Sequence, residues 1–244
     1  IRQQVPGAAV PEIGDKPEAF IHAIDRMGYF EVTQLSGDDA ARNGMYRQNA
    51  ARSRAELSFA DYGEYLRSLA MHAQIKSFSP MYYARIAQLT NKSNQFNLTT
   101  KRLTQDEIAA MAQDQSYLTL YGKLADQFGD NGVVSVVIGK IREQCLDLVL
   151  WLMSCRVLKR DMEYAMMDTL AAACKKRGID TIYGYYYPTA KNAMVRDFYE
   201  KQGFSKVSGD EAGNTVWKLE LAGGYSQKNH VIQVEGDGED AIRS

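Results

Sequence analysis

The stretch Leu146–Phe204 constrains the fold more than any other part of the chain. It opens on a nearly unbroken apolar run, LVLWLM, which is typical of a strand covered on both faces. A basic turn, SCRVLKRD, leads into a helix whose apolar residues recur at spacing four and which ends before Gly178. A tyrosine-rich strand, TIYGYYY, and a second helix over about residues 191–202 complete the stretch. The alternation of strands and helices predicts an α/β fold.

The residues before this stretch predict one strand and two helices. Residues 71–77 alternate weakly between apolar and polar side chains, as a strand does. Pro80 begins a helix that runs to about Leu89, because proline is favoured in a first helical turn. A second helix follows Thr104, which forms a capping-box pattern with Glu107 three residues later.

An antiparallel meander extends the predicted sheet. Its strands cover residues 117–124, 133–141 and 145–153, and the first two are joined by a loop containing FGDNG, a turn-forming sequence. Two further strands follow the second helix, the last of them over Val216–Leu221. The predicted fold is therefore α/β of the α+β type, with a mixed, mainly antiparallel sheet flanked by helices.

The residues before the sheet are polar and helical in character. Residues 37–69 are interpreted as a linker, which Ser58–Asp61 divides into two helices. Residues 1–36 predict a strand in VPGAAVPE and a short helix that is closed by Gly28.

Composition excludes several classes of function. The chain has 244 residues, of which 45% are hydrophobic, enough to bury the core of one large domain or of one domain and a fragment. A net charge of −1 argues against nucleic-acid binding, and no run of about 18 apolar residues predicts a membrane span. Three cysteines do not form a disulfide framework, and three scattered histidines lack the spacing of metal ligands, so no metal site is predicted.

The N-terminus carries two further indications. It lacks the charged-then-apolar order of a signal peptide, so a cytoplasmic location is expected. The first residue is not Met and the chain begins mid-pattern, so a fragment of a longer protein is one expectation, which the sequence leaves open.

Several motifs together resemble known families. A buried strand, a turn that begins a helix, a strand and then FYEKQGF on a helix is similar to the acyl-CoA-binding half of GNAT acyltransferases. More narrowly, LTNKSNQFNLTT, FGDNG, SCRVLKRDMEYAMM and YYPTAKNAMVRDFYEKQGF resemble FkbH-like proteins, over about Val5–Leu221. Those proteins join a HAD-type phosphatase domain to a GNAT-like domain, and some load glycerate-derived acyl units onto acyl carrier proteins.

The resemblance implies a domain organisation. Residues 1–36 correspond to the C-terminal remnant of a HAD-like domain, residues 37–69 to a helical linker, residues 70–222 to a GNAT-like acyltransferase domain and residues 223–244 to a C-terminal tail. The DxDxT motif of HAD phosphatases does not occur in this sequence. Phosphatase activity is therefore not expected from this chain alone.

The basic turn is the expected binding site for the acyl donor. GNAT enzymes carry a Q/R-x-x-G-x-G/A pattern there, whose backbone N–H groups cradle the pyrophosphate of coenzyme A. Arg156 matches this pattern, whereas Lys159 and Asp161 stand where glycine or another small residue is expected. Charge from Arg156, Lys159 and Arg160 is expected to compensate. The alternative is a plain strand-to-helix turn with Asp161 as the helix N-cap.

The second helix carries the expected general acid. The resemblance makes Tyr199 the residue that protonates the leaving thiolate, a transfer that a phenol of ordinary pKa about 10 can make. Asn192, seven residues earlier on the same predicted helix face, is implied as a contact for the pantetheine arm. The alternative roles are a tyrosine at the edge of the core and an asparagine at a helix N-terminus. The expected cofactor-binding residues are Met153, Cys155, Arg156, Val157, Lys159, Arg160, Asp161, Asn192 and Tyr199.

Cys155 is the second catalytic candidate. A thiol beside Arg156 and Lys159 at a helix N-terminus is expected to have a lowered pKa and to act as a nucleophile that forms an acyl-cysteine. The alternative is a small buried hydrophobic residue. Cys145 and Cys174 are interpreted as core residues.

These observations favour an acyltransferase of the GNAT superfamily in an FkbH-like protein. It would move an acyl group, with a glyceryl-type group as one candidate, from or to a thioester of coenzyme A or of the phosphopantetheine of an acyl carrier protein. The expected partners are an acyl carrier protein or a small-molecule acceptor, and the rest of a HAD-like domain if the chain is a fragment. The alternative is a non-catalytic module that docks the carrier protein for a HAD phosphatase or glyceryl transferase.

Overall fold

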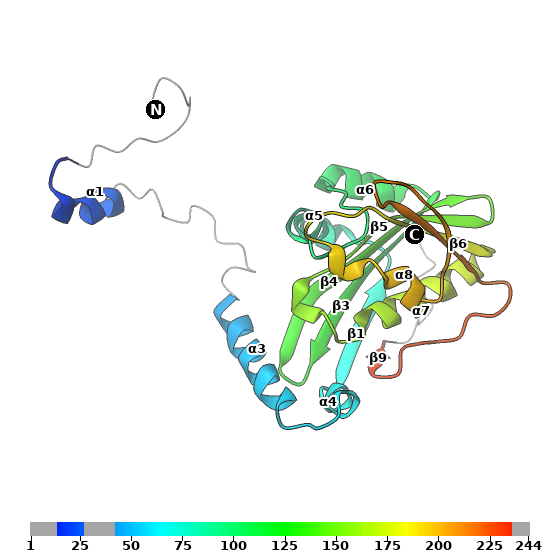
Figure 1. Ribbon diagram of the computed structural model, residues 1–244, viewed down its shortest axis with the longest axis horizontal. Helices are drawn as coiled ribbons and strands as arrows, with labels where there is room; N and C mark the ends of the chain where they lie inside the picture. The colour runs from blue at the N-terminus through cyan, green and yellow to red at the C-terminus, as the bar shows by residue number, and fades with distance from the viewer. Residues whose placement is uncertain (1–13, 27–41, 236–244) are drawn as a thin grey trace, which may run out of the picture. The chain divides into compact units, whose positions relative to one another are not determined.

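The computed structural model describes residues 14–26 and 42–235 (Figure 1). The chain divides into two compact units, residues 1–47 and 48–244. In the first unit a single turn of 3₁₀ helix, η1 (Pro17–Ala19), leads into α1 (Phe20–Arg26), which agrees with the short helix predicted there. The predicted strand in VPGAAVPE and the glycine that was expected to close the helix lie outside the described residues.

Two helices precede the sheet, as the sequence predicts. They are α3 (Arg42–Glu56) and α4 (Tyr62–Ser68). The carboxylate of Asp61 accepts a hydrogen bond from the backbone N–H of Glu64 at 2.8 Å and so caps α4.

The second unit is built on one mixed sheet in the order β7-β8-β6-β5-β4-β3-β1-β9. The pairs β5/β6 and β1/β9 are parallel, and the other neighbours are antiparallel. The strands of this path are β1 (Met71–Lys76), β3 (Tyr117–Asp126), β4 (Gly129–Arg142), β5 (Cys145–Met153), β6 (Thr181–Tyr186), β7 (Ser205–Gly209), β8 (Thr215–Glu220) and β9 (Ile232–Val234). A two-residue strand, β2 (Phe96–Asn97), pairs with β5.

Helices cover both faces of the sheet, so there are two hydrophobic cores. On one face η2 (Pro80–Tyr82), α5 (Tyr83–Lys92) and α6 (Gln105–Gln113) pack on β3–β5. On the other face α7 (Met162–Lys176) and α8 (Phe198–Lys201) form the larger core with alternate residues of the same strands. The predicted mixed, mainly antiparallel sheet flanked by helices is confirmed, and so is the capping box of Thr104 and Glu107.

Two local predictions were wrong. The hairpin between β3 and β4 turns at residues 127–128, and the DNG sequence lies inside β4, where the register shifts between Lys123 and Ala125. The carboxylate of Asp130 accepts from Gly132 N at 2.7 Å, so these residues form a bulge and not the loop. The helix predicted over residues 191–202 is a 3₁₀ turn, η4 (Ala193–Val195), followed by the short α8.

The described part of the predicted tail packs on α7 and β1 within the second unit. The carboxylate of Asp168, on α7, accepts hydrogen bonds from the Tyr225 hydroxyl at 2.6 Å and from the backbone N–H groups of Lys228 and Asn229. The chain then adds β9 beside β1. These contacts anchor residues 225–234 to α7 and to the edge of the sheet.

None of the helices that the structure describes has the length and apolarity needed to cross a bilayer. In the same residues no three His, Cys, Asp or Glu side chains are grouped so as to hold a metal ion.

Candidate functional site

The strands β5 and β6 part at their carboxyl ends, where the sequence predicts the acyl-donor site. They are paired only at their beginnings, where Cys145–Asp147 faces Thr181–Tyr183. Further along, β5 pairs with β2 instead, through Met153 and Leu152. An opening between two neighbouring strands therefore exists at the backbone level.

That opening is filled by residues 96–99, which we name the bridging segment. Leu98 donates its N–H to Trp151 O on β5 at 3.0 Å, and its carbonyl oxygen accepts from Tyr187 N at the end of β6 at 2.9 Å. The hydroxyl of Thr99 donates to Val149 O at 2.8 Å. Leu98 is fully buried. The bridging segment thus takes the place of an additional strand between β5 and the end of β6.

Asn192 holds the bridging segment in place. Its side-chain N–H₂ donates to Asn97 O and to Tyr187 O, each at 2.9 Å. Its Oδ1 accepts from Thr189 N at 2.7 Å and from the Tyr186 hydroxyl at 3.4 Å. The amide is completely buried, and these bonds occupy both its donors and its acceptor. In this conformation it contacts backbone where the sequence predicted a pantetheine arm.

Tyr199 lies in the core and not on an open surface. Its side chain has no exposed area, and its hydroxyl accepts from Tyr185 N at 3.2 Å and donates to Tyr185 O at 3.4 Å. Burial raises the pKa of this phenol well above its ordinary value. Because η4 and α8 are separate, Tyr199 and Asn192 do not share one helix face, contrary to the prediction.

A glycine in β6 makes room for this ring. A methyl group at Gly184 would overlap the ring of Tyr199. The glycine inside TIYGYYY is the signal in the sequence that another group approaches this strand closely. It marks the docking of Tyr199 against β6.

The turn between β5 and α7 keeps a glycine-like backbone without glycine. After η3 (Cys155–Val157), Lys159 has φ 64° and Asp161 has φ 59°. These are the two positions where glycine or a small residue was expected, and a left-handed conformation costs a residue with a Cβ about 1–2 kcal/mol. Asp161 is the N-cap residue of α7, as the alternative interpretation predicts, but its side chain makes no capping hydrogen bond.

Side chains from the residues interpreted as a linker hold this turn. The hydroxyl of Tyr62 on α4 donates to Lys159 O at 2.7 Å. Arg160 points inward and pairs with Asp126 at 3.1 Å, and Asp126 also pairs with Arg52 of α3 at 2.7 Å. Arg160 is 8% exposed, and burial lowers its pKa. Arg160 therefore tethers the turn to β3. The sequence analysis instead expected its charge to face the acyl donor, and in this conformation the side chain is not presented to a ligand.

The other predicted residues of the turn divide by exposure. Met153 and Val157 are buried, Arg156 is half-buried, and Lys159 is exposed. Cys155 is exposed, so the alternative of a small buried hydrophobic residue was wrong for it. Cys174 is buried, which raises the pKa of its thiol to about 12 and agrees with a core role, whereas Cys145 is half-buried.

Comparison with solved structures finds several acetyltransferases that are similar to this chain. No protein-family model matches the chain, and no curated protein matches it. The ribosomal-protein-S18-alanine N-acetyltransferase from Escherichia coli is similar to this chain, with a TM-score of 0.47 and 16% sequence identity. The match covers 61% of this chain and 94% of that one. PaiA N-acetyltransferase from Thermoplasma acidophilum, solved with coenzyme A, has a TM-score of 0.45 and 15% identity over 61% and 99%. A GNAT-family acetyltransferase from Streptococcus pneumoniae has a TM-score of 0.49 and 16% identity over 62% and 99%.

A partly buried carboxylate lies in the first turn of α7. The Oε2 atom of Glu163 is buried and has no hydrogen-bond partner among the residues that the structure describes. Burial raises the pKa of this carboxyl above its ordinary value of 4.5. Burial also raises the pKa of the neighbouring Asp161, and the charge of His230 opposes that rise. Negative charge is therefore disfavoured at these two side chains.

Glu163→Gln is expected to stabilise the protein at neutral pH. Because the folded-state pKa of Glu163 is raised, the wild-type protein loses stability as the pH rises from about 4.5 through the folded-state pKa. The variant lacks this loss, so its advantage in free energy of unfolding should be near zero at pH 4 and positive at pH 7. Urea unfolding at both pH values measures it, with Glu200→Gln on the exposed surface of α8 as the control. An equal effect at both pH values would contradict the assignment.

Proposed function

We propose that the chain transfers an acyl group between a thioester on a phosphopantetheine arm and an acceptor. The observation that carries this proposal is the turn at Lys159–Asp161, strained into a glycine-like path where β5 and β6 part. Backbone strain of about 1–3 kcal/mol per residue persists where the surrounding structure enforces it, and it concentrates at ligand sites. The hydrogen bond from Tyr62 and the buried ion pair of Arg160 enforce it here.

Two features of this turn suit a phosphate group, whereas the carboxyl groups of Asp161 and Glu163 in the same turn oppose an anion when they are charged. The N-terminus of α7 offers backbone N–H groups and the positive end of the helix dipole, and Lys159 is exposed beside it. The Cβ atoms of Lys159 and Asp161 restrict how closely a phosphate approaches. A carrier protein presents one phosphodiester where coenzyme A presents a pyrophosphate, so we propose that the arm of an acyl carrier protein is the preferred donor.

The proposed arm takes the place of the bridging segment. A pantetheine arm is extended and carries amide groups, which can form hydrogen bonds with strand backbone. The bonds that Leu98 makes with Trp151 O and Tyr187 N are of this kind. The proposal therefore includes a displacement of residues 96–99 before the arm binds and before the Tyr199 hydroxyl reaches a thiolate. The exposed thiol of Cys155 is the proposed nucleophile if the acyl group is held on the protein.

The wider context is part of the same proposal. The protein would be FkbH-like and would transfer a glyceryl-type acyl group. Its domains would be the end of a HAD-like domain (residues 1–36), a linker (residues 37–69), the transferase domain (residues 70–222) and a tail (residues 223–244). The rest of a HAD-like domain is then a partner.

A second function is favoured by one observation. The Tyr199 hydroxyl is sealed between β6 and the core, where it bonds to the backbone of Tyr185. A non-catalytic module that docks a carrier protein needs no general acid at that position. Binding without turnover distinguishes this function from acyl transfer.

Calorimetric titration tests the proposal directly. The protein is titrated with acetyl-CoA, with an acetylated holo carrier protein and with the apo form of the same carrier, and acyl transfer is assayed in parallel. Tighter binding of the acetylated holo carrier than of the apo form, together with turnover, supports the transferase. Equal binding of holo and apo carrier without turnover supports docking, and no binding of any of the three contradicts both functions.

Tyr199→Phe is expected to lower the rate of acyl transfer by about 10²–10⁴-fold, the usual contribution of a positioned general acid. The free energy of unfolding should fall by no more than about 1–2 kcal/mol, because the ring remains and two long hydrogen bonds are lost. Tyr186→Phe, which removes a neighbouring buried hydroxyl, is the control. Unchanged turnover in Tyr199→Phe would remove Tyr199 from the acid role.

A further inference from the structure

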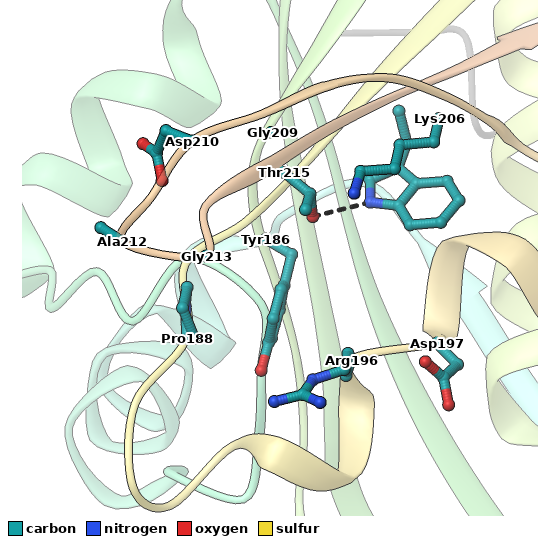
Figure 2. A pocket seen from close by; sticks show the side chains of 11 residues that line it. Tyr186, Pro188, Arg196, Asp197, Lys206, Gly209, Asp210, Ala212, Gly213 and Thr215 are labelled. Atoms are coloured by element: carbon teal, nitrogen blue, oxygen red, sulfur yellow. Dashed lines mark hydrogen bonds between the residues drawn. The ribbon is translucent and has the colours of Figure 1, made fainter.

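A cavity of about 620 Å³ lies beside the carboxyl end of β6 (Figure 2). It is bounded by Tyr186 and Pro188 at the end of β6, by Arg196 at the end of η4, and by Lys206 and Trp217 of the β7–β8 hairpin. Its volume falls within the range of sites that hold small organic molecules. None of the predicted site residues lines it.

Two aromatic rings form the apolar part of this cavity. Tyr186 is 2% exposed, and its hydroxyl donates to Asn192 Oδ1 at 3.4 Å. The indole N–H of Trp217 donates to the hydroxyl of Thr215 at 2.8 Å. Because both polar groups are already bonded within the protein, the rings offer apolar contact to a ligand.

The two cations that line the cavity, Arg196 and Lys206, have no ion-pair partner among residues 14–26 and 42–235. One nearby carboxylate, Asp210, accepts from Asn214 N at 2.9 Å and from Asn214 Nδ2 at 2.8 Å, which commits it to the hairpin turn. Asp197 also lines the cavity, at its exposed rim. A bound anion would supply the opposite charge that Arg196 and Lys206 lack among the described residues.

We propose that this cavity binds a small organic anion, a carboxylate or a phosphate monoester with a flat or apolar body. The anionic group pairs with Arg196 and Lys206, and the body lies against Tyr186 and Trp217. This binding goes beyond the proposed acyl transfer and does not depend on it, because no residue of the turn or of the bridging segment takes part.

The tryptophans provide a direct readout. The chain has two of them, Trp217 in the cavity and the fully buried Trp151, so a ¹⁵N spectrum contains two indole signals. The probes are benzoate and phenyl phosphate, with benzamide as the neutral analogue and benzylamine as the cationic one. We expect saturable shifts of the Trp217 signal with the two anions, with dissociation constants of about 1 mM, and little change for Trp151. The anion with the lower dissociation constant shows whether the cavity prefers a carboxylate or a phosphate monoester. Trp217→Phe assigns the signals.

Charge-neutralising variants test which residues bind the anion. Arg196→Gln and Lys206→Gln, both at exposed positions, should each raise the dissociation constant about five-fold. Lys191→Gln, exposed on the neighbouring loop and outside the cavity lining, should leave it unchanged. The proposal would be overturned if the Trp217 signal showed no saturable shift, or if benzamide and benzylamine shifted it as much as the anions do. It would also be overturned if Lys191→Gln raised the dissociation constant as much as Arg196→Gln and Lys206→Gln. The assay measures binding alone, so a failure of acyl transfer leaves its result intact.

Discussion

Asp126→Asn is expected to lower the free energy of unfolding by about 3–5 kcal/mol, the usual cost of breaking a buried ion pair on one side. Asp126 is the anion between Arg52 and Arg160, at 2.7 and 3.1 Å, and its side chain has no exposed area. Without the carboxylate, two buried guanidinium groups face each other with no negative charge between them. Urea unfolding monitored by circular dichroism measures the loss.

Two further variants separate this effect from a general effect of losing an aspartate. Asp130→Asn removes an exposed carboxylate 3.8 Å from Lys123, and it should cost less than about 1 kcal/mol. The triple variant Arg52→Met, Asp126→Leu, Arg160→Met replaces the whole charged cluster by apolar groups and should recover most of the loss. A loss below about 1 kcal/mol in Asp126→Asn would show that the arginines are compensated by other groups.

Asn192→Ala is expected to cost about 2–4 kcal/mol, because it leaves several buried backbone groups without partners. The carbonyl oxygens of Asn97 and Tyr187 lose their donor, and Thr189 N loses its acceptor. We also expect faster hydrogen exchange of the Leu98 and Tyr187 amides, since the bridging segment is released from the end of β6. Chemical unfolding and exchange followed by NMR measure the two effects.

A nearby asparagine provides the matched control. Asn91 is exposed and donates to Ala87 O at 2.9 Å within α5, so Asn91→Ala should change stability by less than about 1 kcal/mol and leave exchange at Leu98 unchanged. If Asn192→Ala is destabilised while exchange at Leu98 stays slow, the bridging segment is held by its contacts with β5 alone. Tighter binding of a pantetheine thioester by Asn192→Ala would support the proposed displacement.

Much of the fold could be predicted because its signals are local. The capping box of Thr104 and Glu107 involves residues three apart, and the apolar run LVLWLM lies within a single strand, β5. The helix expected over residues 191–202 failed for the opposite reason. Its pattern is helical, but the bonds of Asn192 to Asn97 and Tyr187 fix that residue outside helical geometry.

The candidate site was predicted in position but not in conformation. The sequence located the turn at residues 154–161, since its place between a strand and a helix follows from the order of the elements. It did not show that Thr99 meets Val149, 50 positions away, or that Tyr62 reaches Lys159, 97 positions away. Contacts at such separations depend on the assembled sheet, and a single sequence has no periodicity that reports them.

The C-terminal strand β9 has a consequence for how the molecule behaves in solution. It covers the outer side of β1 over Met71–Ala73, and Glu235 N extends the pairing to Ala73 O at 2.9 Å. A chain cut after Leu221 would present this border of the sheet with free N–H and C=O groups, which recruit strands from other molecules. Residues 232–235 thereby cover part of the β1 edge and keep it from pairing with strands of other molecules.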